Sequence, residues 1–116
     1  MNALTISADK LSFLDGPTPF IWRGTLDWPL YGRFLNEGAT VASSIVTDRR
    51  AVGANTICVG AQLSWWPGLN PTNPLWWDQW RPFAQLCADQ QMRLCIVVFC
   101  DTKTYPLPYQ AHGQHP

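Results

Sequence analysis

The stretch RAVGANTICVGAQLSWWPG, Arg50 to Gly68, decides which fold the sequence predicts. Gly53 stands where the left-handed residue that ends a helix belongs. The next run, Thr56 to Ala61, is apolar without polar alternation, which is typical of a strand covered on both faces. We therefore expect a helix and then a buried strand, and the strand ends at once on Gln62, Trp65 and Trp66.

Similar apolar runs lie on both sides of this stretch. Phe20 to Gly24 predicts an earlier buried strand, which stops before Pro29. Leu94 to Cys100 is the most apolar run of the chain and ends at Asp101. Before the first of these strands, apolar and polar residues alternate on both sides of Asp15-Gly16, which predicts a two-stranded hairpin with the long loop DGPTP.

Helical patterns separate the three apolar runs. Tyr31 to Val52 has helical spacing in two pieces divided by Gly38. A second helix is predicted by the spacing of Trp76, Trp80, Phe83 and Cys87. Pro82 either opens that helix at its first turn or kinks a longer one. Strands that alternate with helices predict an α/β fold with a parallel sheet and helices on one side.

Composition narrows the classes of function. The chain has 116 residues with a net charge of zero, and its few Lys and Arg are scattered, so we expect neither nucleic acid nor a membrane surface as a partner. The amino terminus MNALTISADK lacks the basic-then-apolar order of a signal peptide, and no run approaches the roughly 20 apolar residues of a membrane helix. Seven tryptophans suit either a core or a flat binding platform.

The cysteines and histidines predict no metal site. Cys58 and Cys95 lie inside apolar runs, where free cysteine behaves as a small hydrophobe, so we expect reduced thiols. The spacing of Cys95 and Cys100 from His112 and His115 does not match a zinc site. We therefore expect neither a metal ion nor a cofactor.

Three phrases carry a family resemblance: FLDGPTPFIWRGT, RAVGANTICVGAQ and WWDQWRPFAQLCADQQMRLCIVVFCDT. In this order they resemble the opening of a cellulase-like glycoside hydrolase barrel, from about Leu11 to Asp101. The resemblance implies a partial (β/α)8 TIM barrel, the N-terminal part of a longer fold, in a single incomplete domain over residues 1–116. Residues 1–19 would form the hairpin, residues 20–101 three strands alternating with helices, and residues 102–116 a loop.

The resemblance also implies an active site at the carboxyl ends of the strands. Catalysis in this family needs two carboxyl groups, which come from strands four and seven, so we expect no catalytic residue in this chain. Asn36-Glu37 imitates the family's Asn-Glu pair but lies between helical pieces, and Cys58 stands near the position where many relatives have an Arg. The substrate-binding candidates are the strand-end residues Asp27, Trp28, Gln62, Trp65, Trp66 and Asp101.

Several of these residues have a structural alternative. Trp65 and Trp66 either stack on a sugar or brace the loop, and Asp27 either caps a turn or binds a sugar hydroxyl. Asp101 could equally accept backbone hydrogen bonds. We expect helix packing from Trp76, Trp77 and Trp80, and a core position for Trp22.

The function expected from the sequence is carbohydrate binding by the N-terminal part of a glycoside-hydrolase-like barrel, with the catalytic carboxylates outside the chain. The alternatives are a non-catalytic carbohydrate-binding or virion structural protein, and a different barrel enzyme. The bare sheet edge would favour self-association.

Overall fold

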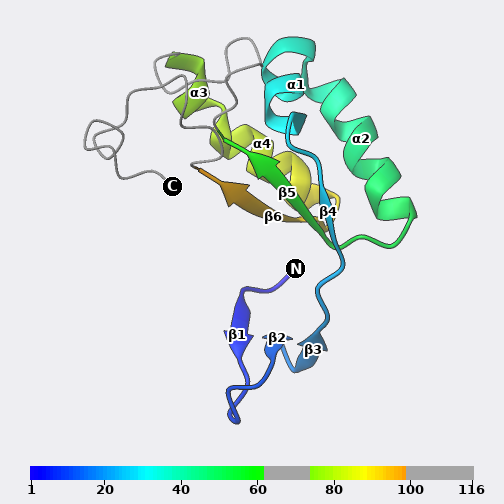
Figure 1. Cartoon of the computed structure of the whole chain (residues 1–116), viewed down its shortest axis with the longest axis vertical. Coiled ribbons are helices and arrows are strands. Elements are labelled where there is room, and N and C mark those ends of the chain that lie inside the picture. The colour runs from blue at the N-terminus through cyan, green and yellow to red at the C-terminus, as the bar shows by residue number, and fades with distance from the viewer. Residues whose placement is uncertain (62–73, 99–116) are drawn as a thin grey trace, which may run out of the picture.

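Two separate sheets organise the molecule. The computed structural model describes residues 1–61 and 74–98. Within these ranges a three-stranded antiparallel sheet lies apart from a three-stranded parallel sheet, and helices pack on one face of the parallel sheet (Figure 1).

The antiparallel sheet contains β1 (Leu4–Ile6), β2 (Phe13–Asp15) and β3 (Thr18–Phe20), in that order. The predicted hairpin around Asp15-Gly16 is confirmed, but its long loop and its limit of two strands were wrong. Gly16 and Pro17 alone connect β2 to β3, and Gly16 has a φ of 61°, a value that glycine adopts without steric cost. The same strand β2 pairs with β1 on its other side.

The parallel sheet has the order β4 (Gly24–Leu26), β5 (Thr56–Gly60), β6 (Arg93–Val97). Both pairs of strands are parallel, as the alternation of strands and helices predicts. The first strand begins at Gly24 rather than at the predicted Phe20, because Phe20 belongs to the antiparallel sheet.

Four helices accompany the described strands: α1 (Leu30–Glu37), α2 (Ala39–Ala51), α3 (Pro74–Asp78) and α4 (Trp80–Asp89). Gly38, with a φ of 92°, separates α1 from α2, as the sequence predicts. None of the helices in residues 1–61 and 74–98 has the length and apolar character needed to cross a bilayer.

Two predicted helix signals are confirmed. Gly53 has a φ of 90° and donates its N–H to the carbonyl oxygen of Arg50, which ends α2 in the left-handed conformation. Pro82 is the third residue of α4, in the first turn, where a residue without an N–H loses no hydrogen bond within the helix.

The core lies between the parallel sheet and its helices. Ile57 and Val59 of β5 are fully buried on this face, where α1 packs against the strand. Tyr31 of α1 is also fully buried; its hydroxyl donates to the carbonyl oxygen of Trp76, and its ring stacks on Trp80 at 3.7 Å. The other buried apolar residues are Leu30, Phe34, Ala42, Val46, Ala54, Ala61, Trp76, Phe83, Cys87 and Met92.

A linker of residues 21–23 connects the two sheets, and Asn55 holds it. The Asn55 Oδ1 accepts a hydrogen bond from the Arg23 N–H at 2.9 Å, and the Asn55 Nδ2 donates to the Ile21 carbonyl at 2.7 Å. The Asn55 N–H donates to the Arg23 carbonyl at 2.9 Å. Trp22, in the middle of the linker, is 57% exposed, so the prediction of a core position for it was wrong.

The observed strand pairing contradicts the predicted fold class. A partial (β/α)8 TIM barrel is not what the described residues form: their strands make two separate three-stranded sheets without a barrel pattern. The alternation of strands and helices predicts parallel pairing but does not determine whether a sheet closes into a barrel. The apolar run after Phe20 suggested a strand, yet Asn55 binds its backbone as a linker.

The described cysteines are free thiols, as expected. Cys58 of β5 and Cys95 of β6 are neighbours across the two parallel strands. Burial, together with contact between the thiols, raises the pKa of Cys58 to about 11. Burial raises the pKa of Cys87 to about 12 and also raises that of Tyr31.

We expect Asn55→Ala to lower the free energy of unfolding by about 1–3 kcal/mol, because it leaves the Arg23 N–H and the Ile21 carbonyl without their partner. Urea denaturation monitored by circular dichroism measures this change. The control is Gln85→Ala, which removes an exposed hydrogen bond to Asp89 within one helical turn of α4 and should cost under about 1 kcal/mol. Equal losses in the two variants would contradict a role for Asn55 in joining the sheets.

Stability should also fall in alkaline solution. Thiols have an unperturbed pKa of 9.0, so above this pH the unfolded chain loses protons that Cys58 and Cys87 keep in the folded state. The free energy of unfolding should therefore decrease as the pH rises from 9 through 11, the raised pKa of Cys58. Denaturation between pH 7 and 11 tests this, and a flat profile would contradict the raised pKa values.

Candidate functional site

At the carboxyl end of β4, the predicted residue Asp27 has structural partners. Its N–H donates to the Cys58 carbonyl at 2.8 Å, and its Oδ2 lies 3.0 Å from the Arg49 Nη2. The Asp27 side chain is only 10% exposed. The carboxylate therefore pairs with Arg49 rather than capping a turn, and the sugar-binding role of Asp27 stays a prediction.

Trp28 is held in a similar way. Its carbonyl oxygen accepts a hydrogen bond from the Gly60 N–H, and its side chain packs against the core. The structure thus brings Asp27 and Trp28 together beside the end of β5. The remaining predicted site residues lie outside the described residues, and their roles stay predictions: Gln62, Trp65, Trp66 and Asp101.

The helical tryptophans divide into two groups. Trp76 is 4% exposed and donates its Nε1–H to the Ala61 carbonyl, and Trp80 packs on Tyr31, so the packing roles predicted for both are confirmed. Trp77 is 63% exposed, with its ring edge-on to Trp76. The packing role predicted for Trp77 was therefore wrong.

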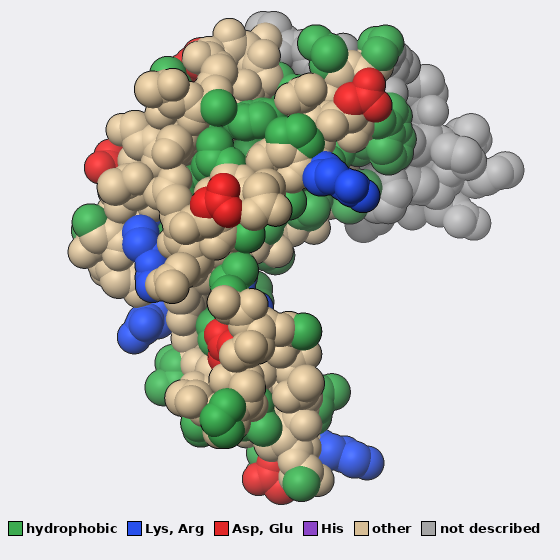
Figure 2. All heavy atoms as spheres, turned by 180° about the vertical axis from the view of Figure 1, so that it is seen from behind, with side chains coloured by type: hydrophobic (Ala, Val, Ile, Leu, Met, Phe, Trp, Pro, Cys, Tyr) green, Lys and Arg blue, Asp and Glu red, His purple; other side chains and the backbone are tan. Residues whose placement is uncertain are grey.

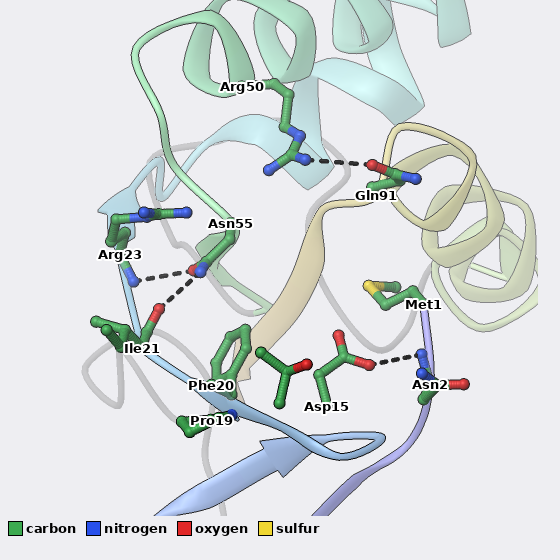
Figure 3. Close-up of a pocket in the computed structure, with 11 residues that line it drawn as sticks. Met1, Asn2, Asp15, Pro19, Phe20, Ile21, Arg23, Arg50, Asn55 and Gln91 are labelled. Carbon is green, nitrogen blue, oxygen red and sulfur yellow. Dashed lines mark hydrogen bonds between the residues drawn. The ribbon is translucent and has the colours of Figure 1, made fainter.

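A pocket of 510 Å³ lies at the opposite, amino end of the parallel strands (Figure 3). We call it the amino-edge pocket. It is bounded by the antiparallel sheet, the linker, the end of α2 and the turn after α4. Its lining residues are Met1, Asn2, Asp15, Thr18, Pro19, Phe20, Ile21, Arg23, Arg50, Asn55 and Gln91.

Asn55 fixes the backbone of Arg23, and Gln91 positions the side chain of Arg50. Asn55 binds the backbone of Arg23 on both sides, through its own side chain and its own N–H. The Gln91 Oε1 accepts a hydrogen bond from the Arg50 Nη2 at 3.2 Å, and the Arg50 Nη1 donates to the Ala54 carbonyl at 3.1 Å. Figure 3 shows Arg23 and Arg50 extending from different elements toward the same part of the pocket.

Arg23 differs from Arg50 in its side-chain contacts. Among the described residues, no hydrogen bond or ion pair engages the guanidinium of Arg23, and the residue is exposed. Figure 2 shows Lys and Arg side chains gathered near the end of α2, at the narrow waist between the two sheets. Arg23 is therefore available to a ligand in this region.

The Arg93 side chain, from the start of β6, contacts the antiparallel sheet. Its Nη2 lies 2.6 Å from the Asp15 Oδ2 and also donates to the Asn2 carbonyl at 2.9 Å, and its guanidinium lies 4.9 Å from the centre of the Phe20 ring. The hydrogen bond from Arg93, together with one from the Asn2 N–H, holds the pKa of Asp15 below its usual range. Asp15 is thus ionised at neutral pH.

The pocket offers donors and acceptors but not the pair of carboxylates needed for glycoside hydrolysis. Of its described lining residues, Asp15 alone is acidic. Within residues 1–61 and 74–98, no group of three or more His, Cys, Asp or Glu side chains is placed to hold a metal ion. The geometry suits the binding of a polar ligand.

The sequence did not lead to a prediction of this pocket, although most of its lining residues lie in the phrases that carry the family resemblance. Eight of them stand in the phrases FLDGPTPFIWRGT and RAVGANTICVGAQ: Asp15, Thr18, Pro19, Phe20, Ile21, Arg23, Arg50 and Asn55. The resemblance directed attention to the carboxyl ends of the strands. The signal available in the sequence was the polar residue at the start of each strand: Arg23, Asn55 and Arg93.

We expect Arg93→Gln to raise the pKa of Asp15 toward 3.8, its unperturbed value, because the variant removes the guanidinium that stabilises the carboxylate. In the natural chain, the stability that Asp15 contributes is present above this pH and is lost as the pH falls through the lowered pKa. Carboxyl-carbon NMR titration measures the change. Arg81→Gln is the control, and an unchanged pKa of Asp15 in Arg93→Gln would contradict the ion pair.

The comparisons with known proteins add no family. No protein-family model matches the chain, and no curated protein matches it. The amino-edge pocket is therefore interpreted from its own residues and their chemistry.

Proposed function

We propose that the chain binds carbohydrate in the amino-edge pocket and that the described residues do not cleave it there. The observation that carries the proposal is the combination of guanidinium, amide and carboxylate groups with the Phe20 ring around one cavity of 510 Å³. Ligand sites commonly combine apolar surface with a few fixed polar groups. The sequence resemblance to glycoside hydrolases supports the same class of ligand.

The polar groups of the pocket match the hydroxyl groups of a sugar. A hydroxyl both donates and accepts hydrogen bonds, so it needs donors and acceptors close together. Arg23 supplies donors, and the ionised Asp15 supplies acceptor oxygens. Asn55 fixes the backbone of Arg23, and Arg93 holds the Asp15 carboxylate.

Binding without cleavage follows from the acidic groups. A glycosidase needs one carboxyl group that donates a proton and a second that acts as nucleophile or base. Among the described residues of the pocket only Asp15 is acidic, and its lowered pKa keeps it ionised, which suits a hydrogen-bond acceptor rather than an acid.

NMR titration of the labelled chain with a panel of monosaccharides and short oligosaccharides tests the proposal. We expect saturable shifts at the amides of Asp15, Thr18 and Asn55, which line the pocket. Shifts confined to Asp27, Trp28 and Trp77 would instead locate the sugar at the carboxyl ends of the strands. Absence of binding by every saccharide would contradict carbohydrate binding altogether.

A pair of variants strengthens this test. Thr18→Trp fills part of the pocket and should weaken sugar binding at least about tenfold, a loss of about 1.4 kcal/mol. Thr5→Trp places the same side chain on β1, at an exposed position outside the pocket lining, and should bind like the natural chain. Equal weakening by both variants would contradict binding in this pocket.

A further inference from the structure

The amino-edge pocket carries an excess of positive charge. Arg23 and Arg50 line it, and the one acidic residue among its described lining residues, Asp15, is engaged by a third cation, Arg93. The whole chain has 8 basic and 8 acidic residues, so this excess is local rather than a property of the composition. A cationic pocket attracts an anionic ligand.

Arg23 and Arg50 have different contacts, but each keeps a positive charge that can bind an anion. Arg50 is oriented by two neutral acceptors, the Ala54 carbonyl and the Gln91 side chain, so its positive charge has no carboxylate partner among the described residues. Arg23 has a fixed backbone and an unengaged guanidinium among those residues. A guanidinium binds a carboxylate through two parallel hydrogen bonds, which are stronger than bonds to a neutral hydroxyl.

We infer that the ligand of this pocket is an acidic saccharide, a sugar that bears a carboxylate, and that Arg23 binds this carboxylate with Arg50 nearby. The inference rests on the proposed function and names its class of ligand. The hydroxyl groups of the sugar contact the polar wall that contains Asp15, and the carboxylate lies at the side of the two arginines. Arg23 determines specificity because it distinguishes an acidic sugar from a neutral one.

Isothermal titration calorimetry in dilute buffer at pH 7 tests the inference with three probes: glucuronate, glucuronamide and glucose. Glucuronamide has nearly the shape of glucuronate without its charge. We expect glucuronate to bind at least about tenfold more tightly than either neutral sugar. The preference should shrink as sodium chloride is raised from about 50 to about 500 mM, because salt screens exposed charges.

Arg23→Gln should remove the preference for glucuronate, so that glucuronate and glucuronamide bind the variant with affinities within about twofold of each other. The fold should survive this change, because Asn55 binds the backbone of Arg23 rather than its side chain. The matched control is Arg81→Gln, which alters an exposed arginine of α4 outside the pocket lining and should keep the preference. Circular dichroism of both variants verifies that they are folded.

The outcomes separate the inference from the proposed function. Equal affinity for glucuronate and glucose would overturn the inference and leave carbohydrate binding intact. A preference that persists in Arg23→Gln would overturn the role of Arg23. If acetate or inorganic phosphate alone binds as tightly as glucuronate, the acidic saccharide is wrong, whereas if no sugar binds, both the acidic saccharide and the proposed function are wrong.

Discussion

The arrangement of the two sheets depends on the contacts of the Arg93 side chain. Arg93 is the first residue of β6 in the parallel sheet, yet its guanidinium binds Asp15 and the Asn2 carbonyl of the antiparallel part and lies over the Phe20 ring. Its own N–H donates to the Asn55 carbonyl at 2.9 Å. One residue therefore joins the start of β6, the end of β2 and the loop before β5. Because Asp15 is partly shielded beside it, removal of the guanidinium would leave a carboxylate without its charged partner.

Asn55 also contributes to the junction between the two sheets, through its hydrogen bonds to the linker. It satisfies the backbone of the linker, so a run of apolar residues crosses between the sheets without joining either of them. The space that remains between linker, antiparallel sheet and parallel strands is the amino-edge pocket. The residues that hold the two sheets together are thus also the residues that shape the candidate site, and the unengaged Arg23 is held in place by the same amide.

The fold could be predicted from the sequence where the signal is local. Gly53 ends α2 because its φ of 90° strains any residue with a Cβ, and Pro82 falls in the first turn of α4 because its missing N–H costs nothing there. The parallel order of β4, β5 and β6 followed from the alternation of strands and helices. The barrel did not follow, because closure depends on which strands meet at the sheet edges and not on the pattern within each strand.

The same contrast between local features and long-range contacts applies to the candidate site. The sequence by itself determined the division of the helices at Gly38, the end of α2 at Gly53, the buried strand Thr56–Gly60 and the free thiols, all of which depend on residues close together in the chain. Only the tertiary structure decided that Arg93 meets Asp15, 78 positions away, and that Gln91 meets Arg50, 41 positions away. Such contacts depend on how the sheets and helices pack, since a side chain finds a distant partner only after the backbone has brought the two elements together. For this reason Arg23 and Asn55, at the starts of β4 and β5, line the pocket, whereas Asp27 and Trp28, the described residues at the end of β4, do not.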